Sequence, residues 1–372
     1  MKRFYTELES LRGVAALWVV FYHAFSTIGH SPADLAHLSF NLIANIALTT
    51  FFGGEGMVVL FFVLSGFVLS ESLSNSDLLK IRTIGGFALK RLTRLMPIAW
   101  AAIFFQIIFI LVYYRSPVPW EKLPAALALN IEALQPFDGP LWSLRVEVAA
   151  SLCFPILLFV NRYGTFAGRL LMLFVLCLVT KNVGNPYFVK WLVAFQCGIM
   201  IYDFRPLTDA ITRTTAKVFL LFAVLLILLP QNLAEFGLLR SPNMILMQTM
   251  GATYLICFVL SGHGEKLTAT LNIASLRWLG RISFSLYAFH IVLDSVAKWT
   301  IWGYVPPERY LPAQTLSALL SVILSVSTAT VAYVLIERPS IKLAHIIAGR
   351  IMRSRSHLTS PSRSQDRATE MR

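Results

Sequence analysis

Charged residues are scarce in this sequence: Asp, Glu, Lys and Arg make up only 14% of its 372 residues, whereas a soluble globular domain contains about 25%. Apolar residues instead account for 56% of the chain. Because roughly 20 apolar residues form one membrane-crossing helix, this content could supply about ten crossings. The composition argues against a disordered chain or a soluble nucleic-acid-binding domain, and it predicts a membrane protein.

Cysteine is scarce as well. Each of the four cysteines lies within an apolar run, where a cysteine usually packs as a small hydrophobic residue. The first apolar run lacks the small-residue cleavage site of a signal peptide. The sequence therefore predicts no disulfide framework, and its first helix is expected to remain part of the protein.

Ten apolar runs predict an all-α, polytopic membrane protein, with a domain over residues 1–345 that contains about ten transmembrane helices. An even number of crossings places both termini on one side of the membrane. Residues 346–372 form a basic tail rich in Ser and Arg, which is expected to be cytoplasmic and disordered. The predicted segments are 11–28, 49–70, 95–113, 141–160, 166–179, 187–202, 218–230, 244–261, 279–296 and 315–336.

Acidic residues are fewer than basic ones, and the net charge is +13. When Lys and Arg are assigned to the loops between the predicted segments, 24 of the 32 fall on the side of the N-terminus and seven on the opposite side. Cytoplasmic loops of membrane proteins carry such an excess. The distribution predicts that both termini are cytoplasmic, and it explains the positive charge without any nucleic acid.

Ionisable residues inside the predicted spans are the candidates for chemistry, because they are costly in a bilayer and usually face a protein interior. His23 lies eleven residues beyond Arg12, which at about 1.5 Å per residue places it near the middle of the membrane. An imidazole titrates near neutral pH and can act as a general base. The alternative is a polar group that only fixes helix packing.

Arg91 and Arg94 are three residues apart, so their guanidinium groups can face the same way. They could bind phosphates on the cytoplasmic side, or they could serve only as anchors that follow the positive-inside rule. Glu147 lies about two helical turns into the fourth span. It could orient His23 as a triad carboxylate does, or Arg145 or another cation could simply neutralise it.

The ninth span carries Ser283, Tyr287, His290 and Asp294 at spacings of three or four residues, which places them on one stripe of a helix. Interhelical hydrogen bonding is the alternative to a functional role. Glu55 lies in a glycine run at the outer start of the second span, which is a weak signal for close approach of a ligand. This arrangement of charged groups suggests a phosphorylated donor on the cytoplasmic side and an acceptor on the outer side.

Six motifs, taken in order, resemble those of the acyltransferase 3 family, whose members are integral-membrane acyltransferases that modify carbohydrates and other extracytoplasmic acceptors. The first motif repeats the family spacing of an arginine, ten residues and a histidine, with Arg12 and His23. Each string is short, but their order and their positions on the predicted helices make a combined match over most of the chain. The motifs lie at 8–13 with 22–23, and at 60–67, 91–97, 141–147, 285–290 and 337–339.

The resemblance implies a membrane acyltransferase that moves an acyl group, expected to be acetyl, from cytoplasmic acyl-CoA to a hydroxyl of an envelope or exported saccharide. Acyl-CoA is then a co-substrate, and neither a permanently bound cofactor nor a metal is expected. The expected partners are a saccharide or lipid-linked saccharide acceptor, the lipid bilayer, and proteins of glycan synthesis or export. The expected location is the bacterial inner membrane.

The same resemblance assigns roles to the candidate residues. His23 would remove the proton of the acceptor hydroxyl or carry the acyl group transiently, and Glu147 would orient His23 or the sugar. The predicted donor-binding residues are Arg12, Arg91 and Arg94. The predicted acceptor-binding residues are Trp142 (as a platform for the sugar ring), Ser143, Tyr287 and His290, together with Glu55, which the resemblance does not map onto a family role.

Two other classes of protein remain open from the sequence. In a proton-coupled transporter, His23, Glu147, His290 and Asp294 would form a proton relay, although no inverted repeat or pair of broken helices is visible. In a regulatory or scaffold membrane protein, the same polar residues would only fix helix packing.

Overall fold

The computed structural model describes residues 5–26, 40–74, 76–182, 187–302 and 310–353. These residues form only helices and no strand, which confirms the all-α class. Six of the described segments are long and apolar enough to cross a membrane, as expected for a multi-pass membrane protein. They are Ile46–Leu73, Ile81–Tyr113, Gly139–Tyr163, Arg213–Glu235, Ser241–Leu260 and Pro312–Gly349.

Each of the ten predicted segments coincides with one or more helices, whereas the count of ten crossings remains a prediction. Helices α1 (Thr6–Phe25) and α14 (Ala274–Trp302), which the sequence predicts as the first and ninth spans, are not among these six segments. The sixth segment is split between the short helices α9 (Leu192–Ile199) and α10 (Ile201–Asp209). The other predicted segments coincide with α1 (Thr6–Phe25), α3 (Gly54–Leu73), α4 (Ile81–Phe109), α7 (Trp142–Tyr163), α8 (Phe166–Asn182), α11 (Arg213–Glu235), α12 (Ser241–Leu260), α14 (Ala274–Trp302) and α15 (Tyr310–Ala332).

Three features differ from the prediction. The second segment is preceded by α2 (Phe40–Phe52), and the chain bends into α3 at Gly53, whose φ of 44° is in the left-handed region. A pair of short helices, α5 (Leu123–Leu127) and α6 (Ile131–Asp138), precedes α7. Helix α16 (Arg338–Arg353) continues past the predicted boundary at residue 345, and the rest of the tail lies outside the described residues. The shorter elements are η2 (Ile110–Tyr114), η3 (Trp120–Lys122), η4 (Gly139–Leu141), η5 (Tyr187–Trp191), η6 (Gly262–Gly264), α13 (Glu265–Leu271) and η8 (Tyr333–Glu337).

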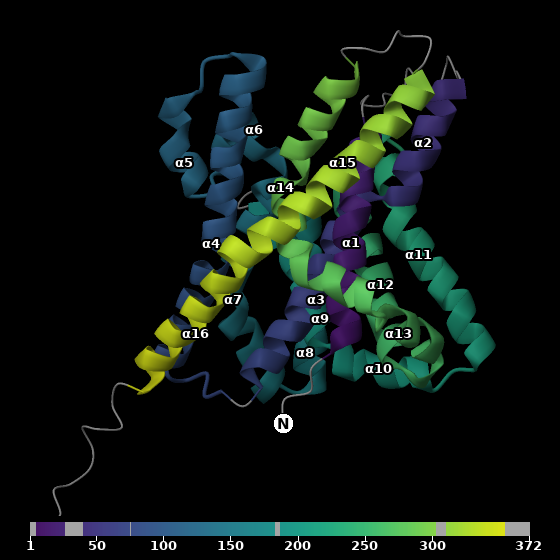
Figure 1. Ribbon diagram of the computed structural model, residues 1–372. Coiled ribbons are helices and arrows are strands. Elements are labelled where there is room, and N and C mark those ends of the chain that lie inside the picture. The colour runs from purple at the N-terminus through teal and green to yellow at the C-terminus, as the bar shows by residue number, and fades with distance from the viewer. Residues whose placement is uncertain (1–4, 27–39, 75, 183–186, 303–309, 354–372) are drawn as a thin grey trace, which may run out of the picture.

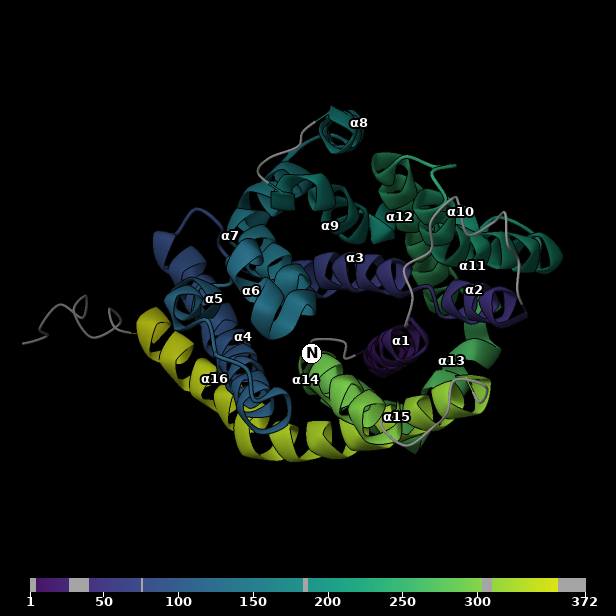
Figure 2. The same ribbon diagram turned by 90° about the horizontal axis from the view of Figure 1, so that it is seen from above.

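The helices form a bundle with α1, α3 and α14 near its centre, as Figure 2 shows from above. Helices α4 and α7 lie on one side of these three, and α11 and α12 lie on the other. Helices α15 and α16 form a long, tilted rim (Figure 1). Helix α1 begins and α16 ends at the lower end of the bundle in Figure 1, so both described ends of the chain lie on one side. Their cytoplasmic location remains a prediction.

The central helices α1 and α14 cross at two glycines. A Cβ atom on Gly13 would meet the backbone of Leu279 and Gly280, and one on Gly280 would meet the backbone of Glu9. Small residues allow such close approach of helices in membranes, where van der Waals packing drives association. The crossing fixes α1, which carries Arg12 and His23, against α14, which carries His290.

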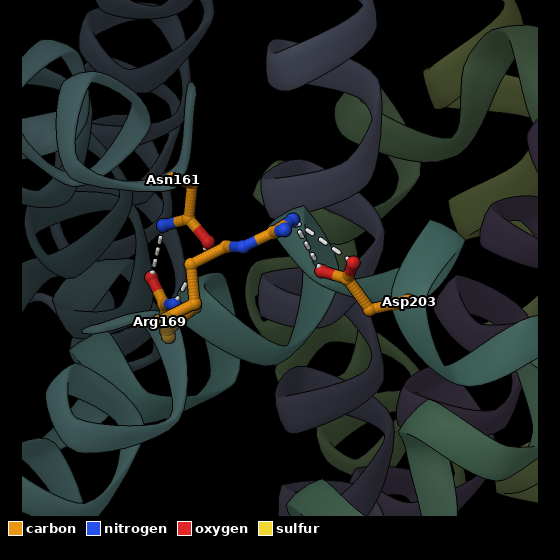
Figure 3. A network of polar contacts seen from close by, with 4 residues as sticks. Asn161, Arg169 and Asp203 are labelled. Carbon is orange, nitrogen blue, oxygen red and sulfur yellow. Dashed lines mark hydrogen bonds and ion pairs between the residues drawn. The ribbon is translucent and has the colours of Figure 1, made fainter. Parts of the chain in front are cut away.

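Polar contacts join four helices at the lower end of the bundle (Figure 3). Arg169 of α8 donates to both carboxylate oxygens of Asp203 of α10 at 2.9 Å. The side-chain amides of Asn161 in α7 and Gln196 in α9 exchange two hydrogen bonds of 2.8 and 3.1 Å. Because these groups are paired with one another, we assign them a structural role.

Candidate active site

An ion pair between Arg91 of α4 and Glu147 of α7 lies among the central helices. The Arg91 and Glu147 side chains are only 12% and 17% exposed. Ser65 of α3 donates to Glu147 at 3.4 Å, and Arg91 Nε donates to Ser151 at 3.4 Å. Glu147 is therefore neutralised by a cation, as one alternative from the sequence predicted, but the cation is Arg91.

Arg145 has a different role, because its Nη1 donates to the carbonyl of Leu129 at 2.9 Å. Leu129 has a φ of 60° in the turn between α5 and α6, a conformation that side chains other than glycine rarely adopt. Arg145 therefore stabilises this turn and does not balance the charge of Glu147.

Arg12 and Arg94 supply the free donors of the site. Their Nε atoms are buried and have no hydrogen-bond partner among the described residues. Both guanidinium groups interact electrostatically with Glu337, a carboxylate that is 2% exposed and accepts a hydrogen bond of 2.6 Å from Ser285. Glu9 also interacts electrostatically with Arg12 and Arg94, and with Arg281. Four guanidinium groups thus face three carboxylates, so the cluster retains positive charge and unused donors that suit a phosphate.

Two adjoining cavities extend from this cluster, and their walls share Arg12 and Glu147. The cavity that touches Arg91 and Arg94 offers about 20 Å³ of space to water-sized molecules. The second offers about 30 Å³ and reaches Tyr287 of α14. Figure 2 shows α1, α3, α4, α7 and α14, which line these cavities, grouped around the centre of the bundle.

Tyr287 connects the second cavity to two histidines. Its ring lies 5.4 Å, between centroids, from the ring of His290, and the rings of His290 and His23 are 5.0 Å apart. His290 Nδ1 lies 2.6 Å from the Tyr287 carbonyl oxygen. A proton on Nδ1 satisfies this contact and leaves Nε2 as an acceptor, and Nε2 is buried without a hydrogen-bond partner among the described residues.

The structure therefore brings His23 together with His290, and Glu147 together with Arg91. The expectation that Glu147 orients His23 is wrong in this arrangement, because the described hydrogen-bond partners of Glu147 are Arg91 and Ser65. Helix packing decides this pairing, since it places Glu147 opposite α4 instead of opposite the last turn of α1.

Ser143 and Tyr287 are both at the second cavity but bond to each other. Ser143 Oγ donates to the Tyr287 hydroxyl at 2.7 Å, and this hydroxyl donates to the Pro140 carbonyl at 3.0 Å. The Trp142 ring packs against that of Trp191, with centroids 5.2 Å apart, so protein occupies part of its surroundings. The acceptor-binding roles of these residues remain predictions.

Glu55 belongs to a separate polar cluster that the sequence did not reveal. Its backbone N–H donates to Gln231 Oε1 of α11 at 2.8 Å, and the Gln231 amide donates to the Tyr22 hydroxyl and, at 3.1 Å, to Glu235. The Tyr22 ring lies 5.1 Å from that of His23. In the sequence, the one signal for a connection between this cluster and His23 is that Tyr22 directly precedes His23.

Lys298 was also missed as a site residue. Its Nζ donates to the His23 carbonyl at 2.8 Å and forms an ion pair of 2.7 Å with Asp294. Asp294, which the sequence placed on the stripe with His290, is 6% exposed and therefore balances Lys298 inside the bundle.

The sequence of this chain matches a known protein family. The family described as "Acyltransferase domain" matches residues 5–337, a range that includes every residue of the site. The fold and the match define an integral-membrane acyltransferase. More particularly, the chain belongs to the acyltransferase 3 family, which confirms both the family and the enzyme class expected from the motifs.

Two individual relatives have names that specify acetyl transfer. The chain is 23% identical over 311 residues to a candidate acetyltransferase, ORF330, of Acidianus two-tailed virus, in an alignment that covers 79% of this chain and 85% of the relative. It is 25% identical over 254 residues to the O-acetyltransferase PaAT-1 of Phomopsis amygdali, covering 59% of this chain and half of that protein's length. No solved structure matches the chain.

Proposed function

We propose that this acyltransferase moves an acetyl group from cytoplasmic acyl-CoA to a hydroxyl of a saccharide at the outer side of the bacterial inner membrane. The observation that carries the proposal is the path of two adjoining cavities from the arginine cluster to Tyr287, beside the histidine pair. Acetyl is the expected group because both relatives are named for acetyl transfer. In this arrangement Arg12, Arg94 and Arg91 hold the phosphates of coenzyme A, and the pantetheine arm follows the line of the two cavities, which must widen to admit it.

His23 is the proposed general base. An imidazole nitrogen of His23 takes the proton of the acceptor hydroxyl while the hydroxyl oxygen attacks the thioester carbonyl carbon. The C–S bond then breaks, and the coenzyme A thiolate leaves and takes up the proton from the imidazolium. The products are the acetyl ester and free coenzyme A.

Transfer of labelled acetyl from acetyl-CoA to glycan extracts tests the proposal, with membranes that contain the wild type, His23→Ala or Arg94→Ala. We expect the wild type to label a glycan and His23→Ala to bind donor without transfer. Arg94→Ala should weaken donor binding by about tenfold or more, as for a lost hydrogen bond to a charged group. Arg94 is preferred to Arg91 because removal of Arg91 would also leave Glu147 without its partner.

His263→Ala is the matched control, because His263 lies in η6 and lines neither cavity, so this variant should transfer at the wild-type rate. Wild-type transfer by His23→Ala would contradict the proposed base. Absence of both donor binding and labelling in the wild type, across several acyl donors and glycans, would contradict the proposed substrates.

A further inference from the structure

A third cavity lies beside α1, and its wall is wholly apolar. It offers about 200 Å³ of space to water-sized molecules, well above the roughly 10–15 Å³ that holds a single water. On α1 the lining residues follow helical spacing and form a stripe that excludes Arg12, so this cavity and the two cavities of the site contact different faces of α1. The lining residues are Leu11, Val14, Ala15, Trp18, Phe51, Met57, Leu60, Val224, Ile227, Leu228 and Leu255.

This apolar cavity reaches the outer surface of the bundle, where we expect lipid to lie. Phe51 on its wall is 56% exposed at the outer surface of the bundle. A polar ligand would gain nothing from such walls, because burial of polar groups without hydrogen bonds is unfavourable. A hydrocarbon chain that enters from the bilayer is the chemistry that fits.

The polar cluster around Glu55 lies about one helical turn further along the same three helices. Tyr22 follows Trp18 by four residues on α1, Gln231 follows Ile227 by four on α11, and Glu55 lies between Phe51 and Met57 at the start of α3. Gln231 connects the other two through its hydrogen bonds. The apolar cavity and the polar cluster therefore follow one another along α1 and α11, in the same order as the chain and headgroup of an amphiphile.

The charges of this cluster favour an uncharged headgroup. Glu55 and Glu235 supply two carboxylates, and Lys190 interacts electrostatically with Glu55. Carboxylates accept hydrogen bonds from hydroxyl groups but repel phosphate. In addition, Tyr22, whose hydroxyl accepts from Gln231, has its ring 5.1 Å from that of His23, so the cluster adjoins the residue that is the proposed base.

From these relationships we infer that the acceptor is a membrane amphiphile, with a hydrocarbon anchor in the apolar cavity and a phosphate-free, hydroxyl-bearing headgroup on the Tyr22, Glu55 and Gln231 cluster. The acceptor then reaches His23 sideways from the bilayer, while the donor enters from the arginine cluster. This inference rests on the proposed acetyl transfer for its chemistry, but binding of the amphiphile can be measured separately.

Photolabelling of the full-length protein measures this binding without any acyl transfer. The probe is a dodecyl glucoside with a diazirine in its alkyl chain, added to the protein in phospholipid nanodiscs. We expect crosslinks to the cavity-facing residues of α1 and α11. Val224→Trp should reduce labelling by about tenfold, since an overpacked site costs one to a few kcal/mol; Val14→Phe, on the opposite wall, is the second variant.

Leu225→Trp is the matched control on the same helix. Leu225 is 41% exposed and does not line the cavity, so labelling should be unchanged. Excess unlabelled dodecyl glucoside should compete with the probe, whereas excess phosphatidylglycerol should not. Equal competition by the phospholipid, or full labelling of both Val224→Trp and Val14→Phe, would overturn the inference and indicate ordinary bilayer lipid.

Acetyl transfer then separates this inference from the proposed function. With labelled acetyl-CoA, dodecyl glucoside should be a better acceptor than methyl glucoside or a dodecyl-phosphate-linked glucose. Val224→Trp should remove the advantage of the dodecyl chain and leave acetyl-CoA binding unchanged. If methyl glucoside is as good an acceptor and Val224→Trp has no effect, the inference fails but acetyl transfer stands; if the probe binds specifically and no saccharide is acetylated, the proposed function fails.

Discussion

Lys298 and His23 are joined by a hydrogen bond of 2.8 Å between the lysine Nζ and the backbone carbonyl oxygen of His23. This carbonyl lies in the last turn of α1, where helix carbonyls have no partner within the helix. Asp294 holds the same ammonium at 2.7 Å. Lys298 thus fixes the end of α1 that carries the proposed base against α14, which carries His290.

Lys298→Met is expected to impair catalysis without impairing donor binding. Loss of this bond frees the last turn of α1, and a displacement of about 1 Å at a catalytic group can lower the rate by about 100-fold. We therefore expect a fall in kcat of about 10- to 100-fold with little change in KM for acetyl-CoA. Lys298→Arg should restore most of kcat, and Lys181→Met, at an exposed position on α8, should have no effect. A change confined to KM would contradict a positioning role.

His290→Gln is expected to lower kcat because the structure leaves His290 Nε2 free as a buried acceptor beside His23. Loss of a group that assists proton transfer typically costs about 100-fold or more. Donor binding, measured with non-transferable acyl-CoA analogues, should stay unchanged because His290 lies beyond the arginine cluster. His263→Gln, in η6 and outside both cavities, is the matched control. A wild-type kcat in His290→Gln would show that His290 only fills space.

The Arg91–Glu147 pair predicts a non-additive effect on stability. Glu147→Leu leaves a largely buried guanidinium without its partner, a change that costs about 3–5 kcal/mol in buried pairs. The double variant Arg91→Met with Glu147→Leu removes both charges and should be more stable than Glu147→Leu alone. Thermal unfolding of the purified variants in detergent measures the difference. Equal losses in the single and double variants would mean that the two charges do not stabilise one another.

The sequence could predict which helices carry the chemistry, because a polar residue within an apolar run is conspicuous. The eleven-residue offset between Arg12 and His23 placed both on one helix at different depths, and the structure has them so on α1. The paired arginines of α4 and the carboxylate of α7 were likewise recognised as candidates, and they form one cluster.

Contacts between distant helices could not be predicted in this way. His23 and His290 are far apart in the sequence, and the close crossing at Gly13 and Gly280 brings α14 against α1. The partner of Glu147 depends on how α7 is rotated about its axis, and a composition of apolar residues on most faces does not specify this rotation. The α5–α6 pair has too few apolar residues in each helix to produce a recognisable run.

The crossing of α1 and α14 predicts that bulk at Gly13 affects both stability and catalysis. A Cβ on Gly13 has no space because it meets the backbone of Gly280, so Gly13→Leu must push the two helices apart and cost about 1–3 kcal/mol or more. Gly85→Leu is the control: nothing lies within 4 Å of a Cβ at Gly85, and replacing glycine inside a helix gains up to about 1 kcal/mol. Thermal unfolding should therefore shift down for Gly13→Leu and stay level or rise for Gly85→Leu. Because the same crossing sets the separation of His23 and His290, kcat of Gly13→Leu should also fall at temperatures where the variant is fully folded; an unchanged kcat there would show that the histidines do not act as a pair.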